Sequence, residues 1–76
     1  LELAKSADRP AGLKRLEEMN ERFPDHVPAY FRRGQLLAED GDVDSARIVL
    51  RQGIATAHRL GDSHAAAEMQ ELLNAL

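Results

Sequence analysis

Three aspartates at alternate positions, Asp40, Asp42 and Asp44, have the spacing that opens a calcium-binding loop. The rest of the loop does not follow. Ser45 stands where the sharp turn needs glycine, and Arg51 stands where a bidentate glutamate would bind the ion. Aspartates also suit the start of a helix, where negative charge is favoured. We therefore predict a helix N-terminus here and no metal site.

The three histidines, His26, His58 and His64, are scattered along the chain. His64 and Glu68 are four residues apart, so on a helix they would share one face. A zinc site needs two further ligands, and the chain has no cysteine to supply them. We interpret the histidines as surface residues and predict neither a metal nor a cofactor.

Catalytic patterns are missing from the sequence. It contains no glycine-rich phosphate loop and no Gly-x-Ser-x-Gly elbow. A carboxylate cluster at Glu17, Glu18 and Glu21 is typical of a solvated helix face. We predict that the chain is not an enzyme.

A basic cluster remains as the last candidate for chemistry. Arg47 and Arg51 are four residues apart, and His58 and Arg59 follow two turns later. Two interpretations stay open: a small face that binds an anionic ligand, or a charged outer surface of a helix.

Composition limits the partners that the chain can have. Its 76 residues make one small domain, and 43% of them are apolar, which indicates a globular fold. The net charge of −3, with both signs mixed along the chain, argues against a nucleic-acid binder and a polybasic membrane anchor. No apolar run approaches the ~18 residues of a membrane span. We expect a cytoplasmic protein, and a fragment or processed chain because it begins at Leu1.

Proline and glycine divide the sequence into helical stretches. The breaks fall at residues 8–10, 24–25, 41–42 and 61–62. Apolar residues recur between the breaks with the period of a helix, and no strand pattern competes. The turns are short, so consecutive helices should pack as antiparallel hairpins in an all-α fold.

The helix ends can be predicted from capping residues. Asp8 should cap a helix with Pro10 in its first turn, leaving residues 1–6 as the end of an earlier helix. Asp25 should cap the next helix, which also has a proline in its first turn. Asp42 should cap the third helix, and Asp62 or Ser63 the fourth. Glycines Gly41 and Gly61 should end the second and third helices.

The sequence matches itself when it is shifted by 34 positions. Aligned identical residues are Leu3 with Leu37, Ala4 with Ala38, Asp8 with Asp42 and Leu16 with Leu50, and Gly12 aligns with Ala46. These are helix-packing and capping positions. A period of this length built from helix hairpins is typical of one class of helical repeat.

The pattern resembles the tetratricopeptide repeat (TPR) family. Tyr30, Gly34 and Leu37 fill its first helix, with Pro24 six residues before the tyrosine. The turn at residues 41–46 resembles the Gly-Asp-x-x-x-Ala turn of the family. Arg33 departs from the pattern, because leucine is usual there. His58 departs too, where the closing proline is expected.

The resemblance implies a short right-handed superhelical array of stacked hairpins in a single domain. Residues 1–24 would be a partial repeat with a truncated first helix, residues 25–60 a full repeat, and residues 61–76 an extra or capping helix. Gly34 should face Ala46 so that the two helices of the hairpin approach closely. Met19 and Gly53 should lie where a helix meets the next repeat.

The resemblance also implies a scaffold that binds a protein or peptide in a groove lined by first helices. The candidate groove residues are Phe31, Arg32, Gln35, Ala38 and Glu39, with Lys5 from the preceding unit. Phe31 could anchor a ligand there, or it could pack against the neighbouring repeat. Two other functions stay open: a structural module that forms a homodimer, and an accessory region of a larger enzyme.

Overall fold

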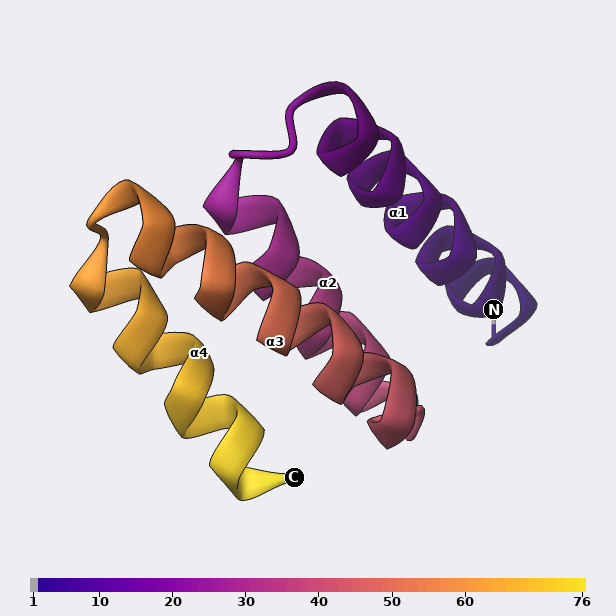
Figure 1. Cartoon of the computed structure of the whole chain (residues 1–76). Helices are drawn as coiled ribbons and strands as arrows, with labels where there is room; N and C mark the ends of the chain where they lie inside the picture. Colours follow the sequence, from indigo (N-terminus) through magenta and orange to yellow (C-terminus); the bar gives the residue numbers. More distant parts are fainter. Residues whose placement is uncertain (1) are drawn as a thin grey trace.

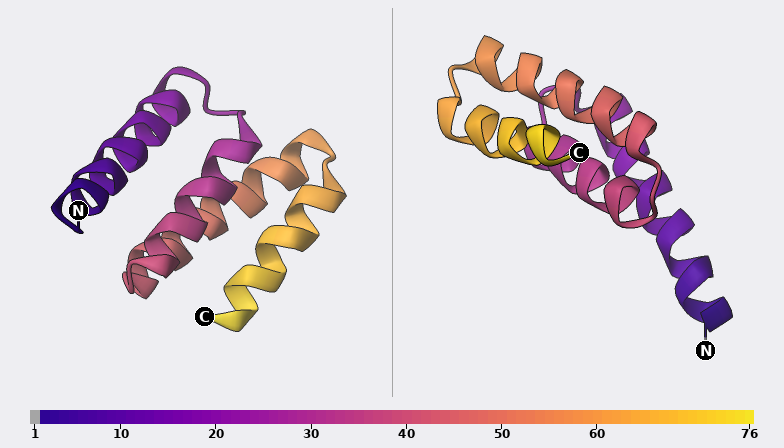
Figure 2. Two further views of the ribbon diagram at one scale, coloured as in Figure 1. Left: turned by 180° about the vertical axis from the view of Figure 1, so that it is seen from behind. Right: turned by 90° about the horizontal axis from the view of Figure 1, so that it is seen from below.

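The computed structural model describes the backbone of residues 2–76 and the side chains from residue 11 onward. This part of the chain is all-α, as predicted, and contains no strand. Its helices are α1 (Glu2–Arg22), α2 (Val27–Glu39), α3 (Val43–Leu60) and α4 (Ser63–Ala75). Each helix runs antiparallel to the one before it (Figure 1). α2 and α4 lie on the same side of α3 and touch each other (Figure 2).

The two glycine turns form as the sequence predicts. Gly41 and Gly61 have φ angles of 84° and 77°, in the left-handed region that favours glycine. After α3, the amide of Gly61 donates to the carbonyl of His58 at 3.1 Å, and that of Asp62 to the carbonyl of Ala57 at 2.8 Å. This pair of bonds satisfies carbonyl groups at the helix end. The corresponding two bonds follow α2, so both turns use the same device.

The aspartates after these glycines are the predicted N-caps. Asp42 Oδ1 accepts a hydrogen bond from the Ser45 amide at 3.3 Å, and Asp62 Oδ1 accepts one from the Ala65 amide at 3.1 Å. Each carboxylate satisfies an amide that the first helical turn leaves unpaired. Asp42 therefore caps α3 and Asp44 lies in its first turn, whereas Asp40 is the C-cap residue of α2.

Replacing Asp42 by alanine should lower the free energy of unfolding by about 1 kcal/mol, because the Ser45 amide loses its acceptor. Asp42→Asn is the matched control, since its side-chain oxygen can still accept the bond. Urea unfolding monitored by circular dichroism measures both. Equal losses in the two variants would contradict the capping role.

The start of α2 differs from the prediction. His26 is the N-cap residue and makes no side-chain capping bond, while Pro28 lies in the first turn as expected. Asp25 was the predicted cap, but its carboxylate pairs with the guanidinium of Arg59 at the end of α3. The hydrogen bond that Arg59 donates to Asp25, and then the attraction between the two charges, raise the pKa of Arg59. Pro28 has no N–H to satisfy, so α2 needs a side-chain cap less than the other helices do.

The predicted break at residues 8–10 is wrong. α1 is one helix from Glu2 to Arg22 and continues through Pro10. Proline removes one donor from the helix ladder. The region predicted as a partial repeat thus holds one helix in place of parts of two.

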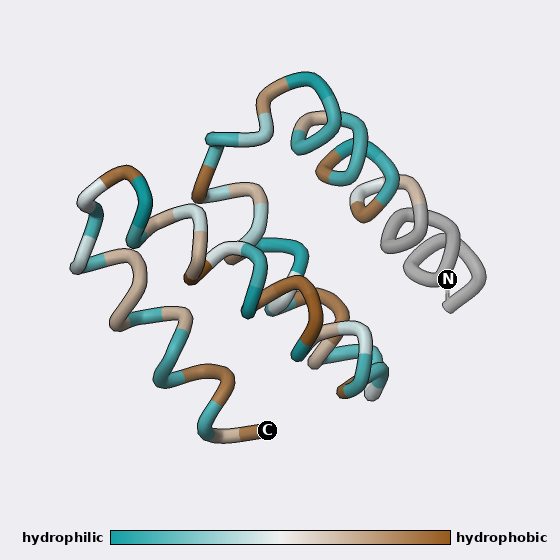
Figure 3. Tube along the Cα trace, viewed as in Figure 1, coloured by the Kyte–Doolittle hydropathy of each residue, from teal (hydrophilic) through white to brown (hydrophobic). Residues whose placement is uncertain are grey.

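The core lies where α2, α3 and α4 meet. Its buried cluster consists of Val27, Leu50, Ala57, Ala66 and Met69. Half-buried leucines from the last turns of α4 pack against this cluster. Apolar residues recur along α3 and α4 at the spacing that brings them to this interface (Figure 3).

Two buried glycines set the spacing between the helices. A Cβ atom on Gly34 would lie 2.5 Å from Cδ2 of Leu50, so glycine allows α2 to approach α3 at that side chain. The three atoms nearest to that Cβ all belong to Leu50, and Ala46, which the sequence predicted to face Gly34, is fully buried. A Cβ on Gly53 would lie 2.5 Å from Sδ of Met69 and 2.7 Å from Cβ of Tyr30. Gly53 therefore lies where α3 meets α4, as predicted.

Candidate partner-binding surface

The predicted groove residues lie along α2. Arg32 is exposed, and its Nη1 donates to Oε1 of Gln35 at 3.4 Å. Phe31, Gln35 and Ala38 are half-buried, and Glu39 is exposed. The structure thus brings Arg32 and Gln35 together in a polar pair. The Lys5 side chain falls outside the described residues.

The sequence left open whether Phe31 packs against a neighbouring helix or is accessible to a ligand, and the structure shows part of each. Its ring packs against the core cluster, which includes Ala66 and Met69 of α4. It is nevertheless only half-buried, so part of the side chain remains accessible beside Gln35. A partly exposed aromatic ring next to a polar pair can contribute both apolar contact and hydrogen bonds.

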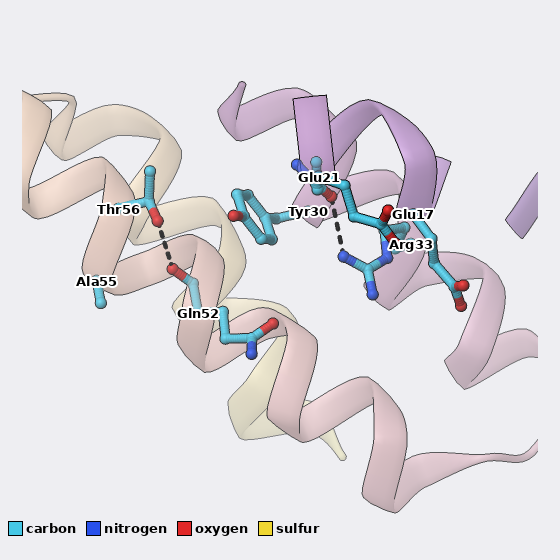
Figure 4. Close-up of a pocket in the computed structure, with 8 residues that line it drawn as sticks. Glu17, Glu21, Tyr30, Arg33, Gln52, Ala55 and Thr56 are labelled. Atoms are coloured by element: carbon cyan, nitrogen blue, oxygen red, sulfur yellow. Dashed lines mark hydrogen bonds between the residues drawn. The ribbon is translucent and has the colours of Figure 1, made fainter. Parts of the chain in front are cut away.

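A hollow between α1, α2 and α3 has a volume of about 500 Å³ (Figure 4). We call it the α1–α3 hollow. Its lining residues are Glu17, Asn20, Glu21, Tyr30, Arg33, Gln52, Ala55 and Thr56. None of the predicted groove residues lines it.

A buried polar pair joins α1 to α2 at the α1–α3 hollow. Asn20 is only 7% exposed, and its Oδ1 accepts a hydrogen bond from Nη1 of Arg33 at 3.0 Å. Its Nδ2 donates to the carbonyl of His26 at 3.2 Å. Nε of Arg33 is buried without a partner. Glu17 and Glu21 line the same hollow.

The repeat pattern marked Arg33 only as a departure from the usual leucine, and Asn20 was not predicted as a functional residue. The structure turns Arg33 toward α1. A signal existed in the sequence, because Asn20 interrupts a run of apolar positions on α1 that includes Leu16, Met19 and Phe23. An arginine at a leucine position and an asparagine on the facing helix could have been paired on that basis.

A second hollow, the α3–α4 groove, measures about 630 Å³. Its lining residues are Arg47, Arg51, Ile54, Ala55, His58, Gln70, Leu73 and Asn74. Arg47 is half-buried, and its Nη2 donates to the carbonyl of Leu76 at 2.8 Å. Arg51 and His58 are exposed.

The structure therefore gathers three members of the predicted basic cluster on one groove and separates the fourth. Arg47, Arg51 and His58 share the α3–α4 groove, whereas Arg59 pairs with Asp25. The two α4 side chains that line the groove with polar groups, Gln70 and Asn74, are uncharged. The α3 wall of the groove thus carries two arginines, Arg51 and Arg47, and Nη1 of Arg47 lies 3.8 Å from Oδ1 of Asp44, whereas the α4 wall is apolar and neutral.

Among the described residues, no three histidine, cysteine, aspartate or glutamate side chains gather in a way that could hold a metal ion. His64 and Glu68 do share a face, with Nε2 and Oε1 3.2 Å apart. Over the described part of the chain, none of the helices is long and apolar enough to cross a membrane.

Comparison with known proteins is informative at the level of structure. No protein-family model and no curated protein matches the chain. The solution structure of a tetratricopeptide repeat domain protein from Salinibacter ruber superimposes with a TM-score of 0.83. It shares 29% sequence identity, and the alignment covers 95% of this chain and 73% of the other. The chain is a TPR-type domain.

This assignment confirms the family that the repeat pattern resembled and the all-α repeat architecture. TPR-type domains generally mediate protein interactions and are typically not enzymes. The similarity thus supports a protein-interaction repeat domain in general terms.

Proposed function

We propose that this TPR-type domain is a non-enzymatic scaffold that binds a protein or peptide partner along α2. The proposed contact residues are Phe31, Arg32, Gln35, Ala38 and Glu39, with Lys5 from α1. The observation that carries the proposal is the Arg32–Gln35 pair beside a half-exposed aromatic ring. An aromatic anchor next to hydrogen-bonding side chains suits recognition of a peptide.

The residue types on this surface support a peptide ligand over a small molecule. Arg32 can donate two hydrogen bonds to a carboxylate, and Gln35 can both donate and accept. Ala38, one turn beyond Gln35, is small and leaves room for a ligand side chain. Glu39 adds a negative charge at the end of the surface, so a ligand with an acidic group near Arg32 and a basic group near Glu39 would fit it best.

Selection from a peptide library displayed on phage tests the proposal. Peptides selected on the wild-type domain would be synthesised, and their affinities measured by isothermal titration calorimetry. We expect Phe31→Ala combined with Gln35→Ala to weaken the selected peptides by at least about tenfold, because truncating an anchor residue costs about 2 kcal/mol. Arg51→Ala, which changes the α3–α4 groove instead, should leave the affinities unchanged.

Phe31 also packs against the core, so loss of binding must be separated from loss of stability. Arg32→Glu provides this separation because Arg32 is exposed and its replacement leaves the core intact. It should weaken acidic peptides while the thermal midpoint stays near that of the wild type. Selected peptides that bind all these α2 variants as tightly as the wild type would refute the proposed surface.

A further inference from the structure

The 34-residue shift that aligns the sequence with itself also places α1 on α3. The aligned pairs are Gly12 with Ala46, Leu16 with Leu50, Met19 with Gly53 and Phe23 with Ala57. In α3 all of these positions are buried. In α1, by contrast, Met19 is 39% exposed and Phe23 is 61% exposed. α1 therefore carries a face like the packing face of α3, but no described helix covers Met19 and Phe23 on that face.

Among the described helices, α4 also has one side that no other helix covers. It packs on α3 and touches α2, so its inner side lies against the α2–α3 hairpin. α2 has a hairpin partner in α3, whereas no described helix packs on the outer side of α4. Its side chains Gln70, Leu73 and Asn74 form one wall of the open α3–α4 groove.

The same shift relates the two hollows. Glu17, Asn20 and Glu21 of the α1–α3 hollow align with Arg51, Ile54 and Ala55 of the α3–α4 groove. The α1–α3 hollow is closed on its third side by the α3 residues Gln52, Ala55 and Thr56. The α3–α4 groove has walls from α3 and α4 but no third helix.

A helix that closes the α3–α4 groove would pair with α4 as α3 pairs with α2, one repeat further along the stack. Under the repeat shift, the α1 residues that correspond to its closing wall are Glu18, Glu21 and Arg22. All three are exposed. Two carboxylates and one guanidinium would thus approach the positively charged α3 wall, so the net charges of the two surfaces are opposite.

From these observations we propose that α1 of a second copy of this chain docks into the α3–α4 groove. Glu18 and Glu21 of the second copy lie against the wall that carries Arg51 and His58. α4 of the first copy covers the apolar face of α1 at Met19 and Phe23. One docking event thereby covers the open face at each end and continues the helical stack across two molecules.

The contact joins different surfaces of the two copies, so it leaves an α1 face open on one molecule and a groove open on the other. Association of this kind is open-ended unless the rotation between copies happens to close a ring. It uses the ends of the stack and leaves the α2 surface proposed for peptide binding accessible. The charges favour a second copy as the occupant, because its α1 brings Glu18 and Glu21 to the wall that carries Arg51.

Charge exchange between the two surfaces tests the proposal. The α1 variant carries Glu18→Arg and Glu21→Arg, and the groove variant carries Arg51→Glu and His58→Glu. Arg47 is kept because it bonds the carbonyl of Leu76. Sedimentation equilibrium over a range of concentrations should show a mass that rises with concentration for the wild type. Each variant alone should associate at least about tenfold more weakly, since it brings like charges together.

Mixing the two variants is the decisive measurement. The basic α1 of one variant then meets the acidic groove of the other, so association should return to within a few-fold of the wild type. Glu71→Arg is the matched control, because Glu71 is an exposed α4 residue outside the groove and its replacement should change nothing. Circular dichroism establishes that each variant is folded, and Glu18→Arg alone is used if Glu21→Arg disturbs the fold near Arg33.

Several results would overturn the proposal. The wild type could sediment as a monomer at every soluble concentration, in which case a helix of another polypeptide is the occupant of the groove. It could self-associate with an affinity that neither charge variant changes, which would place the contact elsewhere. Failure of the mixed variants to associate, while each is folded, would also exclude the proposed pairing.

Discussion

Replacing Leu50 by alanine is expected to lower the free energy of unfolding by about 2–5 kcal/mol. Leu50 is fully buried at the centre of the α2–α3 hairpin, so the shortened side chain leaves a cavity that the helices can fill only in part. A domain of this size has a total stability of about 4–11 kcal/mol. Chemical denaturation should therefore show a large loss of stability, and the thermal midpoint should fall well below that of the wild type.

The contact between Gly34 and Leu50 allows a sharper test by a double-mutant cycle. Gly34→Ala alone should cost about 1–3 kcal/mol, because its Cβ would lie 2.5 Å from Cδ2 of Leu50. In the Leu50→Ala background that clash is gone, and alanine favours the helix by up to about 1 kcal/mol over glycine. The two changes should therefore be strongly coupled. Additive losses would show that Gly34 and Leu50 do not pack against each other.

Replacing Gly53 by alanine is the second change with a large expected effect. The new Cβ would lie 2.5 Å from Sδ of Met69 and 2.7 Å from Cβ of Tyr30. The methionine end can rotate away, but Cβ of Tyr30 is fixed to the backbone of α2, so that helix must shift. We expect a net loss of about 1–3 kcal/mol despite the gain in helix propensity.

Gly12→Ala is the matched control for Gly53→Ala. Both residues are helical glycines, but a Cβ on Gly12 would meet nothing within 4 Å. Gly12→Ala should thus stabilise the protein by up to about 1 kcal/mol. Thermal unfolding monitored by circular dichroism compares the two, and 1 kcal/mol corresponds to a shift of about 4–8 °C in a domain of this size. Midpoints that move in the same direction would contradict the packing of α2, α3 and α4 around Gly53.

The sequence by itself determined the repeat and most of the secondary structure, although α1 continues through the break predicted at residues 8–10. Apolar residues at helical spacing predicted the helices, and glycine followed by aspartate marked both the end of one helix and the cap of the next. These features are local, because a left-handed turn or a capping bond involves residues only a few positions apart. Turns and caps can therefore be predicted without knowing which helices pack against each other. The 34-residue period then indicated stacked hairpins, which the structure confirms.

Tertiary structure decided which side chains meet. Asp25 had the right type for a cap, but a partner 34 residues away, Arg59, takes its carboxylate. Gly34 had the right size for close approach, and the helix register set Leu50 directly against it. The polar pair of Asn20 and Arg33, and the gathering of Arg47, Arg51 and His58 on one groove, likewise depend on how helices cross. Sequence spacing fixes the face of a helix, whereas the choice of neighbour depends on the rotation and offset between helices, which arise only when the whole chain packs.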